Sequence, residues 1–102
     1  MSDVHLMHYV YALRSVSDHG LYIGYSANLR RRFQQHIKGD SIATSYRGPW
    51  KLIYYQAYLD QHDALGREKY LKSRAGRRFL KAQLDHYLQK NPIRCITGTN
   101  RS

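Results

Sequence analysis

The stretch Tyr22–His36 reads Tyr-Ile-Gly-Tyr-Ser-Ala-Asn-Leu-Arg-Arg-Arg-Phe-Gln-Gln-His and decides how the rest of the chain is arranged. Its first residues have the composition of a β-strand, and the residues after Ser26 have the apolar spacing of a helix. The strand carries the phenol of Tyr22, whereas the helix carries the guanidinium of Arg32 and the imidazole of His36. Three groups that can bind a phosphate or move a proton therefore lie within fifteen positions.

The helix is predicted over residues 27–38, with Ser26 as its N-cap. Its buried stripe recurs every four residues and consists of Leu29, Phe33 and Ile37. A second stripe lies one position earlier, about 100° around the axis, and consists of Asn28, Arg32 and His36. We therefore expect Arg32 and His36 at the rim of the apolar face, rather than pointing straight into solvent.

Three stretches are rich in aromatic and β-branched residues and predict strands: residues 8–14, 21–25 and 51–59. Residues 15–20 join the first two strands and have turn chemistry. If this hairpin is centred between Val16 and Ser17, Tyr11 lies directly opposite Tyr22 on one face of the sheet. A slip of one residue would separate the two phenols.

The C-terminal half predicts two more helices, over residues 61–73 and 77–89, with Gly76 as a break between them. The apolar side of the first consists of Ala64, Leu65 and Leu71. Glu68 lies on that same side, where a carboxylate is costly unless its charge is compensated. Glu68 is therefore expected to have a partner.

Together these elements predict an α+β domain: a small three-stranded antiparallel sheet flanked by helices, in the order β-β-α-β-α-α. Residues 39–49 are interpreted as a polar loop. We expect a single domain over residues 1–92 and an irregular C-terminal tail over residues 93–102. At 102 residues the chain is too short for a catalytic domain and a substantial second domain, so any site must be built locally.

The composition is strongly basic, with 17 Lys and Arg against 7 Asp and Glu, a formal charge of +10 and a pI near 10.0. This charge favours a polyanionic partner such as nucleic acid. The single cysteine, Cys95, excludes an intramolecular disulfide and a zinc finger. The N-terminus has no secretory pattern and no segment is apolar enough to span a bilayer, so we expect a cytoplasmic protein without a membrane role.

Five positions carry a resemblance to a known family. The pattern is Tyr9-Val10-Tyr11, then Tyr22-Ile23-Gly24, then Arg32, His36 and Glu68. It resembles the GIY-YIG nuclease superfamily, in particular small stand-alone members related to the N-terminal nuclease domain of the bacterial excision-repair excinuclease. The segment Arg47-Gly48-Pro49-Trp50 is similar to nucleases of the SLX type. The first motif departs from the family name by reading Tyr-Val-Tyr, and no counterpart is evident for the late asparagine of some members.

The resemblance, which covers residues 9–79, implies roles for these positions. Tyr11 corresponds to the last tyrosine of the first motif and Tyr22 to the first tyrosine of the second. Arg32 corresponds to the active-site arginine, His36 to a histidine found in many members, and Glu68 to the metal-binding glutamate. The implied cofactor is one Mg²⁺ or Mn²⁺ ion, and the implied substrate is DNA.

The chemistry of phosphodiester hydrolysis gives a separate reason to expect these residue types in a site. It requires an oriented water, a proton acceptor and positive charge near the developing anion. A single carboxylate can hold one Mg²⁺ whose shell is completed by water. We expect Tyr11 to act as the base or to orient the water, although Tyr22 and His36 remain alternatives because a free tyrosine has a pKa of about 10.

Further basic residues are expected to contact the DNA backbone, namely Arg31, Lys38, Arg47, Lys72 and Arg74. The leading hypothesis is a divalent-metal-dependent DNA endonuclease in repair or processing that is structure-selective or of low sequence specificity, with branched and single-stranded DNA among its possible substrates. The alternative is a non-catalytic nucleic-acid-binding module of the same fold, and a third hypothesis is a basic protein of a ribonucleoprotein. Strand tyrosines are more often packing residues, and Glu68 with Lys72 is an ordinary helical pair. A protein partner and the oligomeric state stay open.

Overall fold

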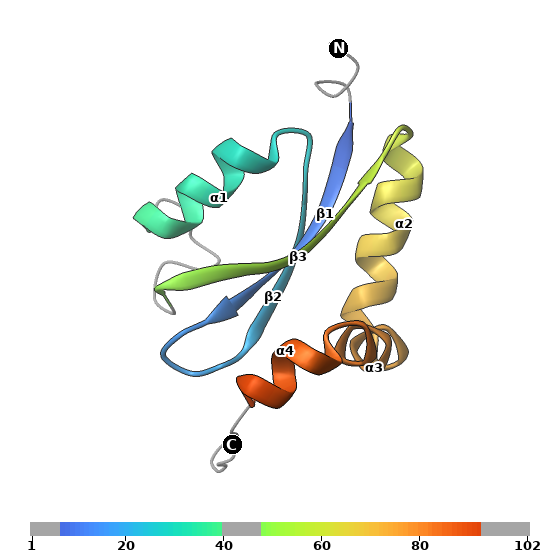
Figure 1. Ribbon diagram of the computed structural model, residues 1–102. Coiled ribbons are helices and arrows are strands. Elements are labelled where there is room, and N and C mark those ends of the chain that lie inside the picture. Colours follow the sequence, from blue (N-terminus) through green and yellow to red (C-terminus); the bar gives the residue numbers. More distant parts are fainter. Residues whose placement is uncertain (1–6, 40–47, 93–102) are drawn as a thin grey trace.

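The computed structural model describes residues 7–39 and 48–92. Its elements follow the order β1 (His8–Ser15), β2 (Leu21–Ser26), α1 (Leu29–Lys38), β3 (Trp50–Tyr58), α2 (Gln61–Lys72), α3 (Arg74–Gln83) and α4 (Asp85–Lys90). The strands form an antiparallel sheet in the order β2-β1-β3, so β1 is the central strand (Figure 1). The predicted α+β class, with a three-stranded antiparallel sheet flanked by helices, is confirmed.

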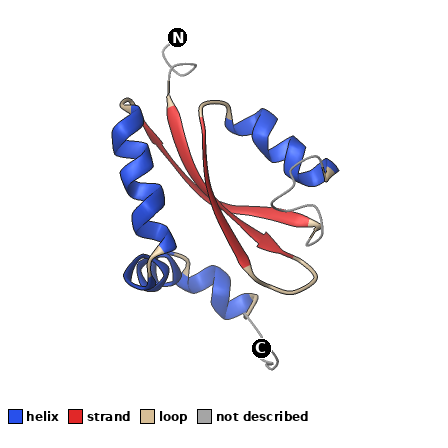
Figure 2. Ribbon diagram, turned by 180° about the vertical axis from the view of Figure 1, so that it is seen from behind, coloured by secondary structure: helices blue, strands red, loops and turns tan. Residues whose placement is uncertain are grey.

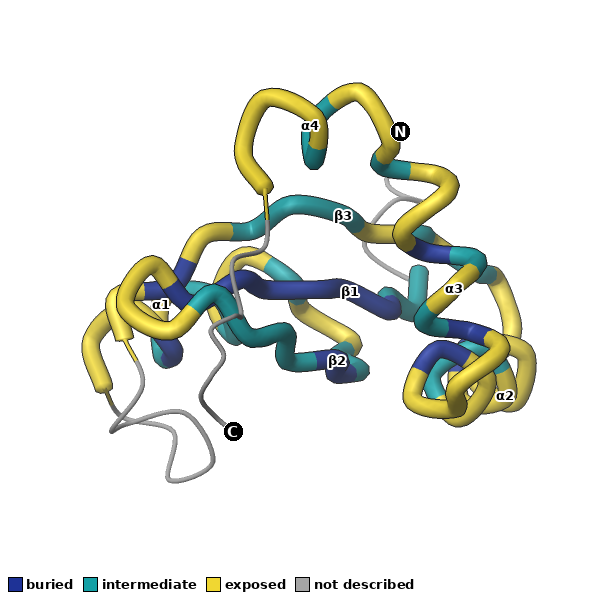
Figure 3. Tube along the Cα trace, turned by 90° about the horizontal axis from the view of Figure 1, so that it is seen from below, coloured by how far each residue is buried: buried dark blue, intermediate teal, exposed yellow. Residues whose placement is uncertain are grey.

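Helices cover both faces of the sheet. Successive residues of β1 point to opposite faces, so its side chains contribute to a core on each side. Figure 2 shows α1 and α2 on opposite sides of the strands. One cluster joins β1 to α2 and α3 and includes Val10, Ala12, Ala64, Leu71 and Leu80. The other joins β1 to α1 and includes Tyr11, Leu13, Leu29 and Phe33. The central strand is therefore buried along most of its length, as Figure 3 shows.

The register of the β1–β2 hairpin differs from the prediction. Tyr11 pairs with Gly24 and Tyr22 pairs with Leu13, so the predicted Tyr11–Tyr22 pair is wrong by two residues. A shift of two residues preserves the face to which each side chain points. The two phenols therefore lie diagonally across the ladder on the same face, with ring centroids 6.4 Å apart.

Helix α1 begins later and is rotated relative to the prediction. Its N-cap is Asn28, whose side chain accepts a hydrogen bond from the backbone N–H of Arg31; the predicted cap, Ser26, belongs to β2. His36 is buried, at 1% exposure, whereas Ile37 is 56% exposed. The predicted buried stripe is therefore wrong at Ile37, because the polar ring of His36 has a hydrogen-bond partner inside and fills that position.

The last predicted helix, over residues 77–89, is two helices. Helix α3 begins at Arg74, where Ser73 caps it by accepting from the N–H of Gly76, and it ends at Gln83. Leu84 separates it from α4. Gly76 was predicted to break the chain between two helices, but it lies inside α3. A Cβ at this position would overlap the backbone of Tyr70, so glycine allows α3 to pack closely against the end of α2. Among the described residues, no helix is long and apolar enough to cross a membrane.

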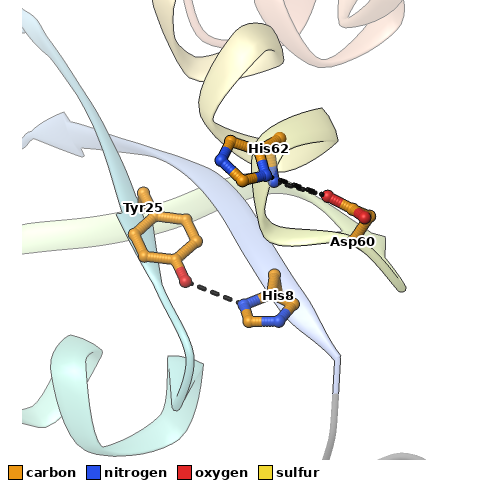
Figure 4. A network of polar contacts seen from close by, with 4 residues as sticks. All are labelled: His8, Tyr25, Asp60 and His62. Atoms are coloured by element: carbon orange, nitrogen blue, oxygen red, sulfur yellow. Dashed lines mark hydrogen bonds and ion pairs between the residues drawn. The ribbon is translucent and has the colours of Figure 1, made fainter.

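Helix α2 begins at the predicted place. The carboxylate of Asp60 accepts from the backbone N–H of His62 at 2.8 Å and caps the helix. Figure 4 shows the two side chains together, with an ion-pair distance of 3.5 Å from His62 Nδ1 to Asp60 Oδ1. Nearby, His8 Nδ1 and the Tyr25 hydroxyl are 2.8 Å apart and join β1 to β2. These contacts join β1 to β2 and hold the start of α2.

Candidate active site

Tyr11 lies at the centre of the candidate site, on the central strand and on the face covered by α1. Its side chain is buried, at 1% exposure, and its ring lies over Gly24 of the neighbouring strand. A Cβ at position 24 would overlap both the hydroxyl and the ring of Tyr11. The glycine of the Tyr22-Ile23-Gly24 motif therefore has a physical reason, because any side chain there would displace the phenol.

His36 of α1 makes the hydrogen bond that fixes this phenol. Its Nε2 lies 2.9 Å from the Tyr11 hydroxyl, and the two rings meet edge to face. Burial lowers the pKa of His36 to about 4, with the charge of Arg32 acting in the same direction. Burial also raises the pKa of Tyr11 to about 12, partly opposed by a hydrogen bond from Arg32. Both groups are therefore neutral at pH 7, and in the tautomer with a free Nε2 the hydroxyl donates to the imidazole.

Tyr22 of β2 is the more accessible phenol. It is half-buried, whereas Tyr11 is almost completely enclosed. Its ring packs against His36 with centroids 5.1 Å apart and against Trp50 with centroids 6.2 Å apart. Trp50 was not predicted as a site residue; its place at the start of the third strand, paired with Ser15, brings it there. Of the two phenols of the site, Tyr22 is therefore the one that solvent reaches more readily.

Arg32 of α1 connects the two phenols. Its guanidinium lies within hydrogen-bonding reach of both, and the bond to Tyr11 is the largest cause of the raised pKa of Arg32. A third contact, 3.0 Å from Nη1 to Oε1 of Gln35, holds the side chain along the helix. Arg32 is only partly buried, so this oriented positive charge remains within reach of a ligand.

Glu68 enters from α2, which packs on the other face of the sheet. Its carboxylate is the one acidic group among the charges that raise the pKa of Tyr11, which places it within electrostatic range of the phenol. The expected partner of Glu68 is Lys72, whose Nζ lies 3.1 Å from Oε2. The structure thus brings the rings of Tyr11, Tyr22 and His36 together, with Arg32 beside the two phenols, and brings Glu68 near without a direct bond to them.

Among the described residues of the candidate site, Glu68 supplies the one carboxylate that could bind a metal ion. Within residues 7–39 and 48–92, no group of three or more His, Cys, Asp or Glu side chains is placed so that it could hold a metal ion. The nearby donors are the oxygens of Glu68 and of the phenols, which are the hard ligands that Mg²⁺ and Mn²⁺ prefer. This donor set fits an ion that keeps several waters, and it does not fit a fully protein-ligated ion such as structural zinc.

The predicted DNA-contacting residues are spread around the molecule. Arg31 and Lys38 are exposed on α1, Lys72 at the end of α2 and Arg74 at the start of α3. Arg47 lies outside the described residues. Their exposure fits phosphate contacts, and no acidic residue pairs with Arg31, Lys38 or Arg74 among the described ion pairs.

Comparison with known proteins gives a consistent result. A family model of the GIY-YIG catalytic domain matches residues 7–81. The chain is similar to a UPF0213 protein of Pediococcus pentosaceus, with 38% identity over 86 residues that cover 83% of this chain and 84% of that protein. It is also similar to a UPF0213 protein of Clostridium perfringens, with 39% identity over 67 residues, 65% of this chain and 71% of that protein.

Among solved structures, the chain is similar to the solution NMR structure of a UPF0213 protein from Bacillus halodurans. The identity is 28%, the TM-score is 0.46, and the match covers 93% of this chain and 99% of that one.

Proposed function

This chain belongs to the GIY-YIG family of nucleases, and we propose that it is a divalent-metal-dependent DNA endonuclease that cleaves phosphodiester bonds by hydrolysis. The observation that carries the proposal is that the partly buried Tyr22 and Arg32 lie beside a buried Tyr11–His36 pair. Phenol, guanidinium and imidazole from three separate segments meet there, on a chain with a formal charge of +10.

Arg32 binds the scissile phosphate in this proposal. The guanidinium is already oriented by two phenol oxygens and Gln35, so little entropy is lost when its remaining N–H groups donate to a nonbridging phosphate oxygen. The same contact strengthens as negative charge develops during attack on phosphorus. Arg32 therefore stabilises the transition state more than the bound substrate.

Tyr22 contacts the attacking water, because it is the phenol that solvent can reach. Tyr11 and His36 are each only 1% exposed, so they act through Tyr22 and Arg32 as positioning residues. The water oxygen forms a bond to phosphorus and the bond to the leaving deoxyribose oxygen breaks. The leaving oxygen takes up a proton from solvent, and the water proton passes to an acceptor in the site. Tyr22 is the acceptor within reach when its phenol is ionised, or it orients the water while a phosphate oxygen receives the proton.

Glu68 is the residue that would hold the divalent ion, with water and phosphate oxygens as the other ligands. When bound, the ion supplies a Lewis acid that polarises the phosphate and offsets charge on the leaving oxygen. Lys72 neutralises the carboxylate at 3.1 Å in the absence of a metal, and its exposed ammonium is free to turn toward the DNA backbone.

The DNA contacts proposed here read the backbone and not the bases. Arg31, Lys38 and Arg74 are exposed cations on helices whose other faces pack on the sheet, which suits contacts to the phosphate backbone. This distribution supports a nuclease of low sequence specificity, or one that selects branched or single-stranded structures, with a role in DNA repair or processing.

The test is a cleavage assay with nicked, branched, single-stranded and double-stranded DNA in Mg²⁺, Mn²⁺ and EDTA. We expect cleavage of at least one substrate in either metal and none in EDTA. Binding of every substrate without cleavage of any would favour the alternative, a non-catalytic binding module. In that case the affinity should still fall steeply as salt rises, because released counterions drive binding.

A further inference from the structure

A pocket lies between α1 and β3, on the flank of α1 opposite to Arg32. Its volume is about 490 Å³, within the range of roughly 300–1,000 Å³ found for pockets that hold small ligands. Its lining combines aromatic and aliphatic side chains with an amide and a guanidinium: Tyr9, Phe33, Leu52, Tyr55, Asn28 and Arg30. No acidic side chain occurs among the described residues that line it, so an anionic ligand meets no repulsion there.

Helix α1 separates this pocket from the candidate active site. Arg30 and Arg32 are two positions apart, which is about 200° around a helix axis, so their side chains leave opposite flanks of α1. Arg30 lines the pocket, whereas Arg32 contacts Tyr11 and Tyr22. Both regions belong to the same face of the sheet, because Tyr55 in the pocket pairs directly with Tyr11 across β1 and β3.

Tyr55 is the most accessible aromatic ring of the pocket. It lies on an edge strand and is 56% exposed. Its ring meets Tyr9 at 61° with centroids 6.2 Å apart, so the two rings do not stack face to face. A large exposed phenol beside other apolar side chains is costly to leave uncovered, and a planar ligand can stack on it.

We propose that this pocket binds an unpaired nucleobase of a DNA strand, stacked on Tyr55, with Arg30 on a neighbouring phosphate. The proposal rests on the proposed function, since it makes the pocket a second contact for the same substrate. The π-face of any base can stack on an aromatic ring, and a nearby cation attracts the backbone. In a duplex each base is already stacked between its neighbours, so only a single-stranded or flapped region offers a free base.

The geometry lets one strand reach both sites. Arg30 and Arg32 leave opposite flanks of α1, so a strand that reaches both must pass across the helix, which is about 10–12 Å wide with its side chains. An unpaired strand spans that distance with a few nucleotides. The pocket would therefore hold a base a few nucleotides from the scissile phosphate and would favour substrates that are unpaired at that position.

The test compares Tyr55→Ala with Tyr55→Phe, which keeps the ring and loses only the hydroxyl. Binding of the full chain to a fluorescent single-stranded oligonucleotide and to its duplex is measured by anisotropy in EDTA. We expect Tyr55→Ala to weaken single-strand binding by between about 5-fold and 150-fold, and to change duplex binding less than twofold. Tyr55→Phe should bind both like the wild type. Equal single-strand affinity for all three proteins, or equal loss for both forms of DNA, would overturn the proposal.

A second readout reports stacking directly. An oligonucleotide with 2-aminopurine at successive positions should lose fluorescence at one position with wild type and Tyr55→Phe, and at none with Tyr55→Ala. Arg30→Ala should reduce the salt dependence of single-strand binding by about one phosphate contact, whereas Tyr55→Ala should leave it unchanged. These measurements need no turnover, so they still test the pocket if the protein is not a nuclease. If the wild type cleaves DNA and Tyr55→Ala binds single strands with unchanged affinity, only the pocket proposal is rejected.

Discussion

The hydroxyl of Tyr11 lies 2.9 Å from Nε2 of His36, and both side chains are buried between α1 and the sheet. A buried hydrogen-bond acceptor that loses its partner costs about 1–3 kcal/mol. Tyr11→Phe should therefore lower the free energy of unfolding by about that amount, measured by denaturant unfolding. Tyr55→Phe is the matched control, because its hydroxyl is on an exposed ring, and should change stability by less than about 0.5 kcal/mol. Equal stability of the two variants would contradict the importance of this bond.

The pKa of His36 predicts a pH dependence of stability. Because the folded-state pKa is about 4 and the unfolded chain titrates near 6.5, the unfolded state binds the proton first as pH falls. The contribution of neutral His36 is present above pH 6.5 and is lost toward pH 4, by about 3 kcal/mol. His36→Gln lacks this titration. The free-energy difference between wild type and His36→Gln should therefore shrink by about that amount from pH 7 to pH 4, and a constant difference would refute the buried neutral imidazole.

Gly24 should tolerate no side chain while Tyr11 is present. Gly24→Ala places a Cβ against the ring and hydroxyl of Tyr11, and overpacking of this kind costs about 1–3 kcal/mol. Gly66→Ala is the control, since a Cβ there meets nothing within 4 Å and alanine favours the helix by about 0.5–1 kcal/mol. Thermal unfolding should show a lower Tm for Gly24→Ala and a slightly higher one for Gly66→Ala. Removing the ring in Tyr11→Ala should reduce the cost of Gly24→Ala, and full additivity would argue against the contact.

Arg32 and Arg31 are neighbours with different surroundings. Arg32 contacts both phenols, whereas Arg31 is exposed and was predicted only as a DNA contact. Arg32→Ala should lower the single-turnover cleavage rate by about 10²- to 10³-fold, because it removes a charge from the transition state. Arg31→Ala should weaken binding modestly and leave the rate at saturating enzyme within about threefold. Similar rates for the two variants would remove Arg32 from the active site.

The fold class, the strand positions and the family followed from the sequence because each depends on local pattern. Alternating strand composition, the cap at Asp60 and five motif positions are all readable within short windows. The errors arose where contacts between distant segments determine the structure. Turn chemistry did not fix the hairpin register at Tyr11, and hydrophobicity alone could not show that His36, and not Ile37, fills the space beside a buried phenol.

Two other features depend on contacts between distant segments, which no local sequence pattern predicts. The role of Gly24 required the observed register, which sets it opposite Tyr11. The Tyr55 pocket required the crossing of α1 over β3, since its lining comes from three separate segments. The motif therefore predicts which residues form the site, but not which of them solvent can reach. Here solvent reaches Tyr22 and not Tyr11.

The most direct test of the central claim is the single-turnover cleavage rate of Glu68→Gln in Mg²⁺, at enzyme concentrations that saturate the DNA. The amide keeps the size of the side chain but is a weaker metal ligand, and Asp63→Asn on the same helix is the matched control. The account predicts that Glu68→Gln binds DNA like the wild type and cleaves it at least 100-fold more slowly, with partial recovery in excess Mn²⁺, while Asp63→Asn cleaves normally. Wild-type rates for Glu68→Gln would contradict a metal site at Glu68 and the mechanism built on it.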